Sequence, residues 1–175
     1  MIYCLLSLFF TMFADLSTNN PILNQTVTNI QFLVEFILLS LLMRSAIVDH
    51  TIQQIINVIT TLFIGIVITY SLMKGMDTNL PLLYGFGNVL LVMNAVLLAI
   101  DVVRSEKKSL ISSYLFWIVA AIFFCYGCIF LLAFGWKFIF TRNNITALEI
   151  WQFGFLALIL KSAFFSVGAI VYKRA

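Results

Sequence analysis

Residues 156–168, LALILKSAFFSVG, place one lysine, Lys161, in a run of otherwise apolar or small side chains. In a water-soluble protein such a stretch would form an ordinary buried helix. The rest of the chain indicates a different setting, because 63% of its 175 residues are hydrophobic, only 10% are charged, and the mean hydropathy is +1.10. Soluble domains carry about 25% charged residues. We therefore expect an integral membrane protein, with Lys161 inside the lipid-spanning region.

Apolar runs of about twenty residues recur between short polar breaks, which is the length that crosses a hydrocarbon core of about 30 Å as a helix. These runs lack the alternation of membrane β-strands. The sequence predicts an all-α fold, a polytopic transmembrane helical bundle that forms a single domain over residues 1–175. Residues 2–16 are short for a span, and we expect them to form a short N-terminal hydrophobic helix. The five predicted spans cover residues 27–46, 55–73, 81–100, 114–136 and 147–172.

Lysine and arginine are divided unevenly between alternate breaks, and the richer side of a membrane protein is normally cytoplasmic. This places the C-terminus in the cytoplasm and the protein in the cytoplasmic (inner) membrane. The expected surroundings are the lipid bilayer and a protein partner or a second copy of the chain. The basic residues are explained by topology, so nucleic acid is not an expected partner. One side carries Arg44, Arg104, Lys107, Lys108, Lys173 and Arg174, and the other carries Lys74, Lys137 and Arg142.

Two charged residues lie near the middle of predicted spans, Glu35 in residues 27–46 and Lys161 in residues 147–172. A charged side chain at the bilayer centre costs about 2.5–3.5 kcal/mol on insertion scales, so it normally faces the bundle and meets a partner. Opposite signs at similar depth predict that the two residues form a buried pair. The pair would either fix how the helices dock or handle a proton, an ion or a ligand. Snorkelling to an interface, or a different partner, is the remaining alternative.

Helical spacing supports an inward orientation for both charges. Thr28, Gln31 and Glu35 share one face of their predicted helix, which gives it a polar stripe. Small residues beside the lysine would let a neighbouring helix approach closely, as at many membrane interfaces. The expected packing residues on the lysine's face are Gly154, Ala157 and Gly168.

Milder polar residues also fall inside the predicted spans. Asn94 and Asp101 recur with Gly87 every seven positions, and Asn57 lies in residues 55–73. Hydrogen bonds between helices are one explanation for these side chains. A water-filled cavity is the other.

The sequence Cys125-Tyr126-Gly127-Cys128 has the C-x-x-C spacing that thiol oxidoreductases use. However, the pair lies in the middle of a predicted span, and the only other cysteine is Cys4. Both thiols also fall on a face of small residues, which favours a packing role over a redox role.

Signatures of other enzymes and of metal sites are missing from the sequence: it has no phosphate-binding glycine loop, zinc spacing or serine nucleophile elbow. The single histidine, His50, follows Asp49 in a polar break, an arrangement typical of a solvated turn or a helix cap. We therefore expect no cofactor, no metal and no enzymatic activity.

At FLVEFILLSLLMRSAI, YLFWIVAAIFFCYGCIFLLAF and LILKSAFFSVGAIVYKR, the chain resembles bacterial multi-pass membrane proteins of unknown function, similar to membrane sensor-type helical bundles. The resemblance covers residues 27–175. It implies importance for a glutamate in an early span, a Phe-Trp pair opening a later one, and a lysine followed by a glycine in the last. Such proteins have a further N-terminal span, which implies a truncated or mis-started chain here. The residues so indicated are Glu35, Phe116, Trp117, Lys161 and Gly168.

Three functions are consistent with these features. The first is a non-enzymatic, sensor-like or accessory membrane subunit whose output lies in a partner, because the sequence shows no soluble output domain. The second is a small transporter or ion-coupled carrier, which the polar residues Glu35, Asn57, Asn94 and Lys161 within the spans would serve. The third is a membrane thiol oxidoreductase using Cys125 and Cys128.

Overall fold

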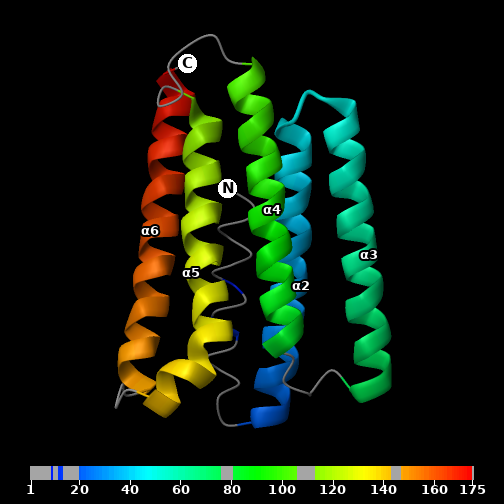
Figure 1. The fold of residues 1–175 in the computed structure, drawn as a ribbon, viewed down its shortest axis with the longest axis vertical. Coiled ribbons are helices and arrows are strands. Elements are labelled where there is room, and N and C mark those ends of the chain that lie inside the picture. Colours follow the sequence, from blue (N-terminus) through cyan, green and yellow to red (C-terminus); the bar gives the residue numbers. More distant parts are fainter. Residues whose placement is uncertain are drawn as a thin grey trace.

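The computed structural model describes residues 9, 12–13, 20–75, 81–105, 113–142 and 147–174. It gives the backbone alone for residues 81–82, 105, 132–142, 147–153 and 174. In these ranges the regular structure is helical, and five long helices run alternately up and down the bundle (Figure 1). They are α2 (Pro21–Ala46), α3 (His50–Lys74), α4 (Pro81–Ser105), α5 (Tyr114–Arg142) and α6 (Ala147–Arg174).

The start of α2 is fixed by an asparagine and a proline. The side chain of Asn20 accepts a hydrogen bond of 3.2 Å from the backbone N–H of Leu23, and Pro21 occupies the first turn, where its missing N–H is harmless. The helix therefore begins before Val27, the expected start of the span. The polar residues between them fit a helix because their side chains bond within it. The Thr26 hydroxyl, for example, donates to the backbone carbonyl four residues earlier at 2.9 Å.

The start of α3 is likewise earlier than the expected Ile55. Asp49 caps the helix, its carboxylate accepting a 2.8 Å hydrogen bond from the backbone N–H of Thr51, so the helix begins at His50. This hydrogen bond lowers the pKa of the Asp49 carboxyl below its ordinary value. The helix ends at Gly75, whose φ of 90° is a conformation that glycine adopts without strain.

The remaining three helices begin at the expected residues 81, 114 and 147, and they continue past the expected ends to 105, 142 and 174. A hydropathy pattern finds the apolar part of a helix, whereas the backbone hydrogen bonds continue into the polar residues that follow. The expected short helix at residues 2–16 lies outside the described residues, except for residues 9, 12 and 13, which are helical.

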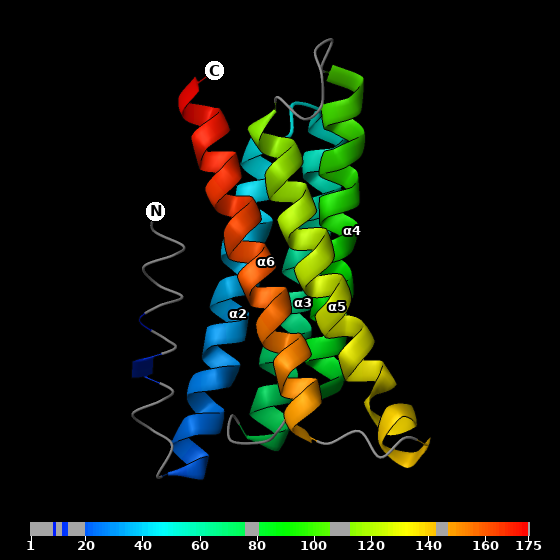
Figure 2. The same ribbon diagram turned by 90° about the vertical axis from the view of Figure 1, so that its left-hand side faces the viewer.

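The helices pack as a chain of neighbours. α6 lies along α5, α5 packs on α4, α4 packs on α2, and α3 packs on α2 and α4. Figures 1 and 2 show the α5–α6 pair on one flank and α3 on the other. The most deeply buried apolar side chains come from α2, α4 and α5, so the core lies between these three helices. They include Phe36, Leu39, Leu91, Leu98 and Ile122, each 0% exposed.

The missing side chain of Gly87 leaves space on α4 for one ring from α2 and one from α3. A Cβ atom at this position would lie 2.4 Å from Cζ of Phe32 and 2.9 Å from Cζ of Phe63. The two rings meet edge to face, 6.3 Å apart between centroids. A glycine therefore lets two aromatic side chains fill the junction of three helices.

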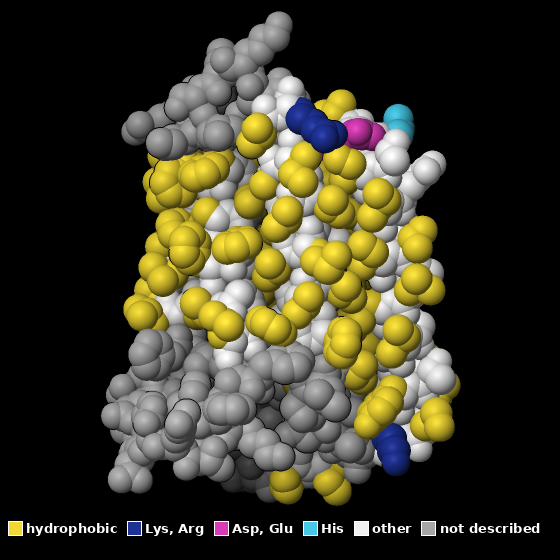
Figure 3. All heavy atoms as spheres, viewed as in Figure 1, with side chains coloured by type: hydrophobic (Ala, Val, Ile, Leu, Met, Phe, Trp, Pro, Cys, Tyr) yellow, Lys and Arg dark blue, Asp and Glu magenta, His cyan; other side chains and the backbone are white. Residues whose placement is uncertain are grey.

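The outer surface of the bundle is apolar over most of its height. Figure 3 shows a broad band of hydrophobic side chains, with the charged side chains at the two ends. All five helices are long enough and apolar enough to cross a membrane. The C-terminal ends of α2, α4 and α6 lie at the same end of the bundle (Figure 1), which brings Arg44, Arg104 and Lys173 to that end and Lys74 to the other.

Candidate functional site: a buried charge cluster

Three side chains from three helices meet in the bundle, Glu35 of α2, Tyr126 of α5 and Lys161 of α6. Lys161 Nζ donates a hydrogen bond of 2.8 Å to Glu35 Oε1 and forms an ion pair with it. The Tyr126 hydroxyl donates to the same oxygen at 2.6 Å. The lysine ammonium also lies 5.3 Å from the centroid of the Tyr126 ring, within the range of a cation–π interaction. We call these three residues the charge cluster.

The cluster is well shielded from the exterior. The side chain of Lys161 is 9% exposed, that of Glu35 is 20% exposed, and Tyr126 is 3% exposed as a residue. Ala157, one turn before the lysine on α6, is 3% exposed, and Cys125 next to the tyrosine is fully buried. Small and apolar neighbours therefore bring α6 close enough for a long cation to reach the carboxylate of α2.

The charge cluster joins α2 to α5 and α6, two helices with which α2 is not closely packed. α2 is closely packed against α3 and α4, and α6 against α5, but α2 and α6 are not among the closely packed pairs of the described helices. Contact between α2 and α6 at this depth is made by the long side chains of Glu35 and Lys161. The cluster thus connects the α5–α6 pair to the α2 side of the bundle.

The energetics of such a cluster depend on both charges being present. A buried ion pair with good geometry roughly offsets its own desolvation, but removing one partner leaves an uncompensated charge and costs about 3–5 kcal/mol. Here the geometry is good, because one carboxylate oxygen accepts two short hydrogen bonds. The arrangement can hold helices in register, and it can exchange a proton if the lysine is displaced.

The tyrosine of the cluster was not singled out from the sequence. Its signal was present, since a hydroxyl in the middle of an apolar helix normally finds a hydrogen-bond partner. Tyr126 lies within the C-x-x-C sequence, where the spacing of the cysteines is the more conspicuous feature.

The other polar residues singled out from the sequence are spread along the bundle. Asn94 is fully buried, and its Nδ2 donates to Ser40 Oγ at 3.4 Å, while no hydrogen-bond partner for its Oδ1 is found in the described part of the chain. Asp101 is 6% exposed and accepts a 2.9 Å hydrogen bond from the backbone N–H of Val48, in the α2–α3 connection. Gln31 and Asn57 are half-buried and lie outside the charge cluster.

The packing residues expected on α6 differ in their surroundings. A Cβ atom at Gly168 would lie 3.3 Å from Cβ of Trp117, so this glycine brings α6 close to α5. Ala157 is buried. A Cβ atom at Gly154 would meet no described atom within 4 Å, so a packing role for this glycine stays a prediction. Gly154 lies near the start of α6, away from the contact between Gly168 and Trp117. Phe116, which the resemblance indicated, packs edge to face against Trp117, with 5.5 Å between ring centroids.

The two cysteines of the C-x-x-C sequence face different surroundings. Cys125 is buried and Cys128 is exposed, and both thiols are free. The burial of Cys125 fits the expected packing role, whereas Cys128 lies outside the packed interface. Side chains three residues apart on a helix point about 60° away from each other, and here this difference carries the second thiol out of the interface.

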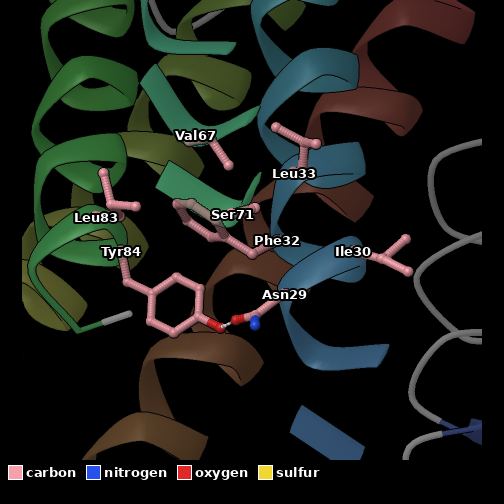
Figure 4. Close-up of a pocket in the computed structure, with 8 residues that line it drawn as sticks. All are labelled: Asn29, Ile30, Phe32, Leu33, Val67, Ser71, Leu83 and Tyr84. Carbon is pink, nitrogen blue, oxygen red and sulfur yellow. Dashed lines mark hydrogen bonds between the residues drawn. The ribbon is translucent and has the colours of Figure 1, made fainter. Parts of the chain in front are cut away.

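A second polar contact, not singled out from the sequence, lies near the start of α2. The Tyr84 hydroxyl of α4 donates to Asn29 Oδ1, and Gln25 Nε2 lies 3.3 Å from that oxygen and 3.4 Å from the hydroxyl. Figure 4 shows Tyr84 and Asn29 pointing toward each other beside a cavity of about 20 Å³. A cavity of this size has room for about one water molecule. In the sequence, this contact was indicated by Gln25 and Asn29, two amide side chains four residues apart on one face of α2.

Within the described ranges, no group of three or more His, Cys, Asp or Glu side chains is placed to hold a metal ion. No family model, curated protein or solved structure matches the chain.

Proposed function

We propose that the chain is a multi-pass protein of the bacterial cytoplasmic membrane, a sensor-like or accessory subunit without enzymatic activity. The membrane location is supported by five helices long and apolar enough to cross a bilayer. The sensor-like role rests on one observation, that an ion pair of 2.8 Å joins α2 to α6, two helices that are not closely packed. In this interpretation the charge cluster is a latch. It holds α6, together with the Tyr126 side of α5, against α2 until an input opens it.

A latch of this kind gives the bundle two arrangements. α6 would be the helix that moves, because among the described helices it is closely packed against α5 alone, while α5 would stay with α4, and α2 with α3 and α4. An input that separates or neutralises Glu35 and Lys161 would shift the equilibrium toward the open arrangement. The size of the shift is set by the difference between its affinities for the open and closed arrangements. Lysine and arginine are more numerous at the end that carries the C-terminus, which supports a cytoplasmic location for that end and for the partner that receives the signal.

The buried thiol of Cys125 is a native reporter of this latch. It is 0% exposed and lies next to Tyr126 of the charge cluster. We expect N-ethylmaleimide to label Cys125 faster in Lys161→Met than in the unchanged protein, with peptide mass spectrometry used to separate this thiol from Cys128. Lys173→Met is the matched control, since Lys173 is an exposed lysine on the same helix.

The latch proposal fails if Lys161→Met leaves the labelling rate of Cys125 at the value of the Lys173→Met control. Resistance of the protein to alkaline carbonate extraction tests membrane integration separately. Release into the carbonate supernatant would overturn the membrane proposal itself.

A small transporter or ion-coupled carrier is the second candidate. The favouring observation is the fully buried Asn94 carbonyl oxygen, for which the described residues offer no hydrogen-bond partner. Vesicles loaded with a pH-sensitive dye would measure proton flux for the unchanged protein and for Glu35→Gln. Flux that is lost in Glu35→Gln, while the thermal stability in detergent is retained, would favour the carrier over the latch.

A further inference from the structure

An apolar groove runs along the outside of the bundle between α4 and α5, toward the end that carries the C-termini of α2, α4 and α6. Its volume is about 370 Å³. α4 and α5 are closely packed neighbours, so the groove lies in the outer seam of an intact interface. Its apolar lining consists of Val96, Ala99, Ile100 and Val103 from α4, and Val119 and Phe123 from α5.

The groove opens to the exterior along its length. Val103 is 59% exposed, Phe123 is 47% exposed and Val96 is 41% exposed. The α4 residues follow the spacing i, i+3, i+4 and i+7, so they form one continuous stripe along the helix. The surface thus offers an elongated apolar channel rather than an enclosed cavity.

One end of the groove is cationic. Arg104, in the last turn of α4, is exposed and completes the lining. Arg44 and Lys173 lie at the same end of the bundle. Two acidic groups of the described residues lie near this end: Asp49, whose carboxylate caps α3 by accepting from Thr51 and whose pKa the Arg104 charge helps to lower, and Asp101, which is buried and accepts from the backbone N–H of Val48. An arginine at the end of an apolar channel matches an elongated amphiphile with an anionic head.

We propose that this groove binds one anionic phospholipid. An acyl chain lies against the apolar stripe of α4 and α5, and the headgroup phosphate accepts hydrogen bonds from the Arg104 guanidinium, whose planar fork suits a phosphate. The site rests on the proposed membrane location, because only there is a phospholipid abundant. The basic end of the bundle is also the end that the positive-inside rule assigns to the cytoplasmic leaflet.

Native mass spectrometry of the detergent-purified protein tests the headgroup contact. The protein is titrated with dioleoylphosphatidylglycerol and with dioleoylphosphatidylcholine, which share acyl chains and differ in charge. We expect tighter binding of the glycerol lipid. Arg104→Gln should weaken that binding about fivefold, the ratio that corresponds to about 1 kcal/mol for one basic residue at a membrane surface. Arg44→Gln, which changes an exposed arginine outside the groove, should leave it unchanged.

A second pair of variants tests the acyl-chain contact. Ala99→Phe places a ring in the groove without changing any charge, and it should reduce the binding of both lipids. Ala169→Phe adds the same ring to an exposed position of α6 and should have no such effect. The thermal stability of Ala99→Phe should match that of Ala169→Phe, which would show that the variant is folded.

Equal affinity for the two lipids, or equal effects of Arg104→Gln and Arg44→Gln, would overturn the proposed lipid site. Unchanged binding of both lipids to Ala99→Phe would also overturn it, as would tighter binding of a hydrophobic peptide than of either lipid in the groove. Each of these results leaves the membrane proposal standing if the protein resists carbonate extraction, so the two proposals fail by different observations.

Discussion

Replacing Gly87 with alanine should destabilise the bundle, although alanine is the better helix former. The new Cβ atom would lie 2.4 Å from Cζ of Phe32 and 2.9 Å from Cζ of Phe63, whereas carbon atoms in contact prefer about 3.5–4.0 Å. Neither ring can simply turn aside. Phe63 is 3% exposed and packs on Phe36, with 4.4 Å between centroids, and Phe32 meets Tyr84 edge to face at 4.7 Å.

Two opposing free-energy contributions set the size of the stability change in Gly87→Ala. Overpacking a core costs about 1–3 kcal/mol, and replacing glycine by alanine within a helix contributes up to about 1 kcal/mol in the other direction. Gly65→Ala is the matched control, because a Cβ atom there would meet nothing within 4 Å and the helix term acts alone. The difference between the two variants therefore isolates the overpacking term, and we expect Gly87→Ala to be less stable than Gly65→Ala by about 1–3 kcal/mol.

The assay is reversible unfolding in mild detergent, followed by circular dichroism. A third variant, Gly87→Ala combined with Phe32→Leu, removes the ring atom nearest the new Cβ and should recover part of the loss. If Gly87→Ala proves as stable as Gly65→Ala, the close packing of the Phe32 and Phe63 rings against Gly87 is refuted.

Three further changes can be followed by the same unfolding assay. Tyr126→Phe removes a hydrogen bond to the cluster carboxylate and should cost about 1.5–3 kcal/mol, the usual value for a bond to a charged group; no change in stability would count against that bond. Asp101→Ala leaves the N–H of Val48 without its acceptor and should cost about 1–3 kcal/mol, while Asp101→Asn, which keeps an acceptor oxygen, should cost less; equal losses would refute this role. Asp49→Ala should lower the Tm by removing the cap of α3. Because the bond from Thr51 lowers the pKa of Asp49, its contribution is fully present above the ordinary carboxyl pKa of about 3.9 and is lost as the pH falls through the lower value of the folded state. A Tm difference between Asp49→Ala and the unchanged protein that persists at full size in acid would contradict this.

The sequence predicted the helical architecture well because the apolar runs are long and separated by polar breaks. It predicted the starts of α2 and α3 poorly. Hydropathy counts Thr26 and Gln53 as polar, but within the helix the Thr26 hydroxyl bonds to a backbone carbonyl, and the amide of Gln53 donates to the carbonyl of Ile47 at 2.6 Å. Capping by Asn20 and Asp49 was the signal that places both starts correctly.

The pairing of Glu35 with Lys161 could be predicted because two opposite charges at similar depth have few other partners in an apolar bundle. The third member, Tyr126, could not be placed from periodicity alone, since its orientation depends on how α5 rotates against α2 and α6. The same rotation exposes Cys128 while burying Cys125. Which face of a nearly uniformly apolar helix turns inward is decided by packing, and the sequence pattern of α5 carries little information about it.

The central claim, that Glu35 and Lys161 stabilise the bundle through each other, is tested most directly by a double-mutant cycle. The free energy of unfolding in detergent is measured for the unchanged protein, Glu35→Gln, Lys161→Met and the double variant. The 2.8 Å contact predicts that the double variant is more stable than the sum of the single losses implies, with a coupling of about 1–3 kcal/mol. Single losses that add to within about 0.5 kcal/mol would contradict the account.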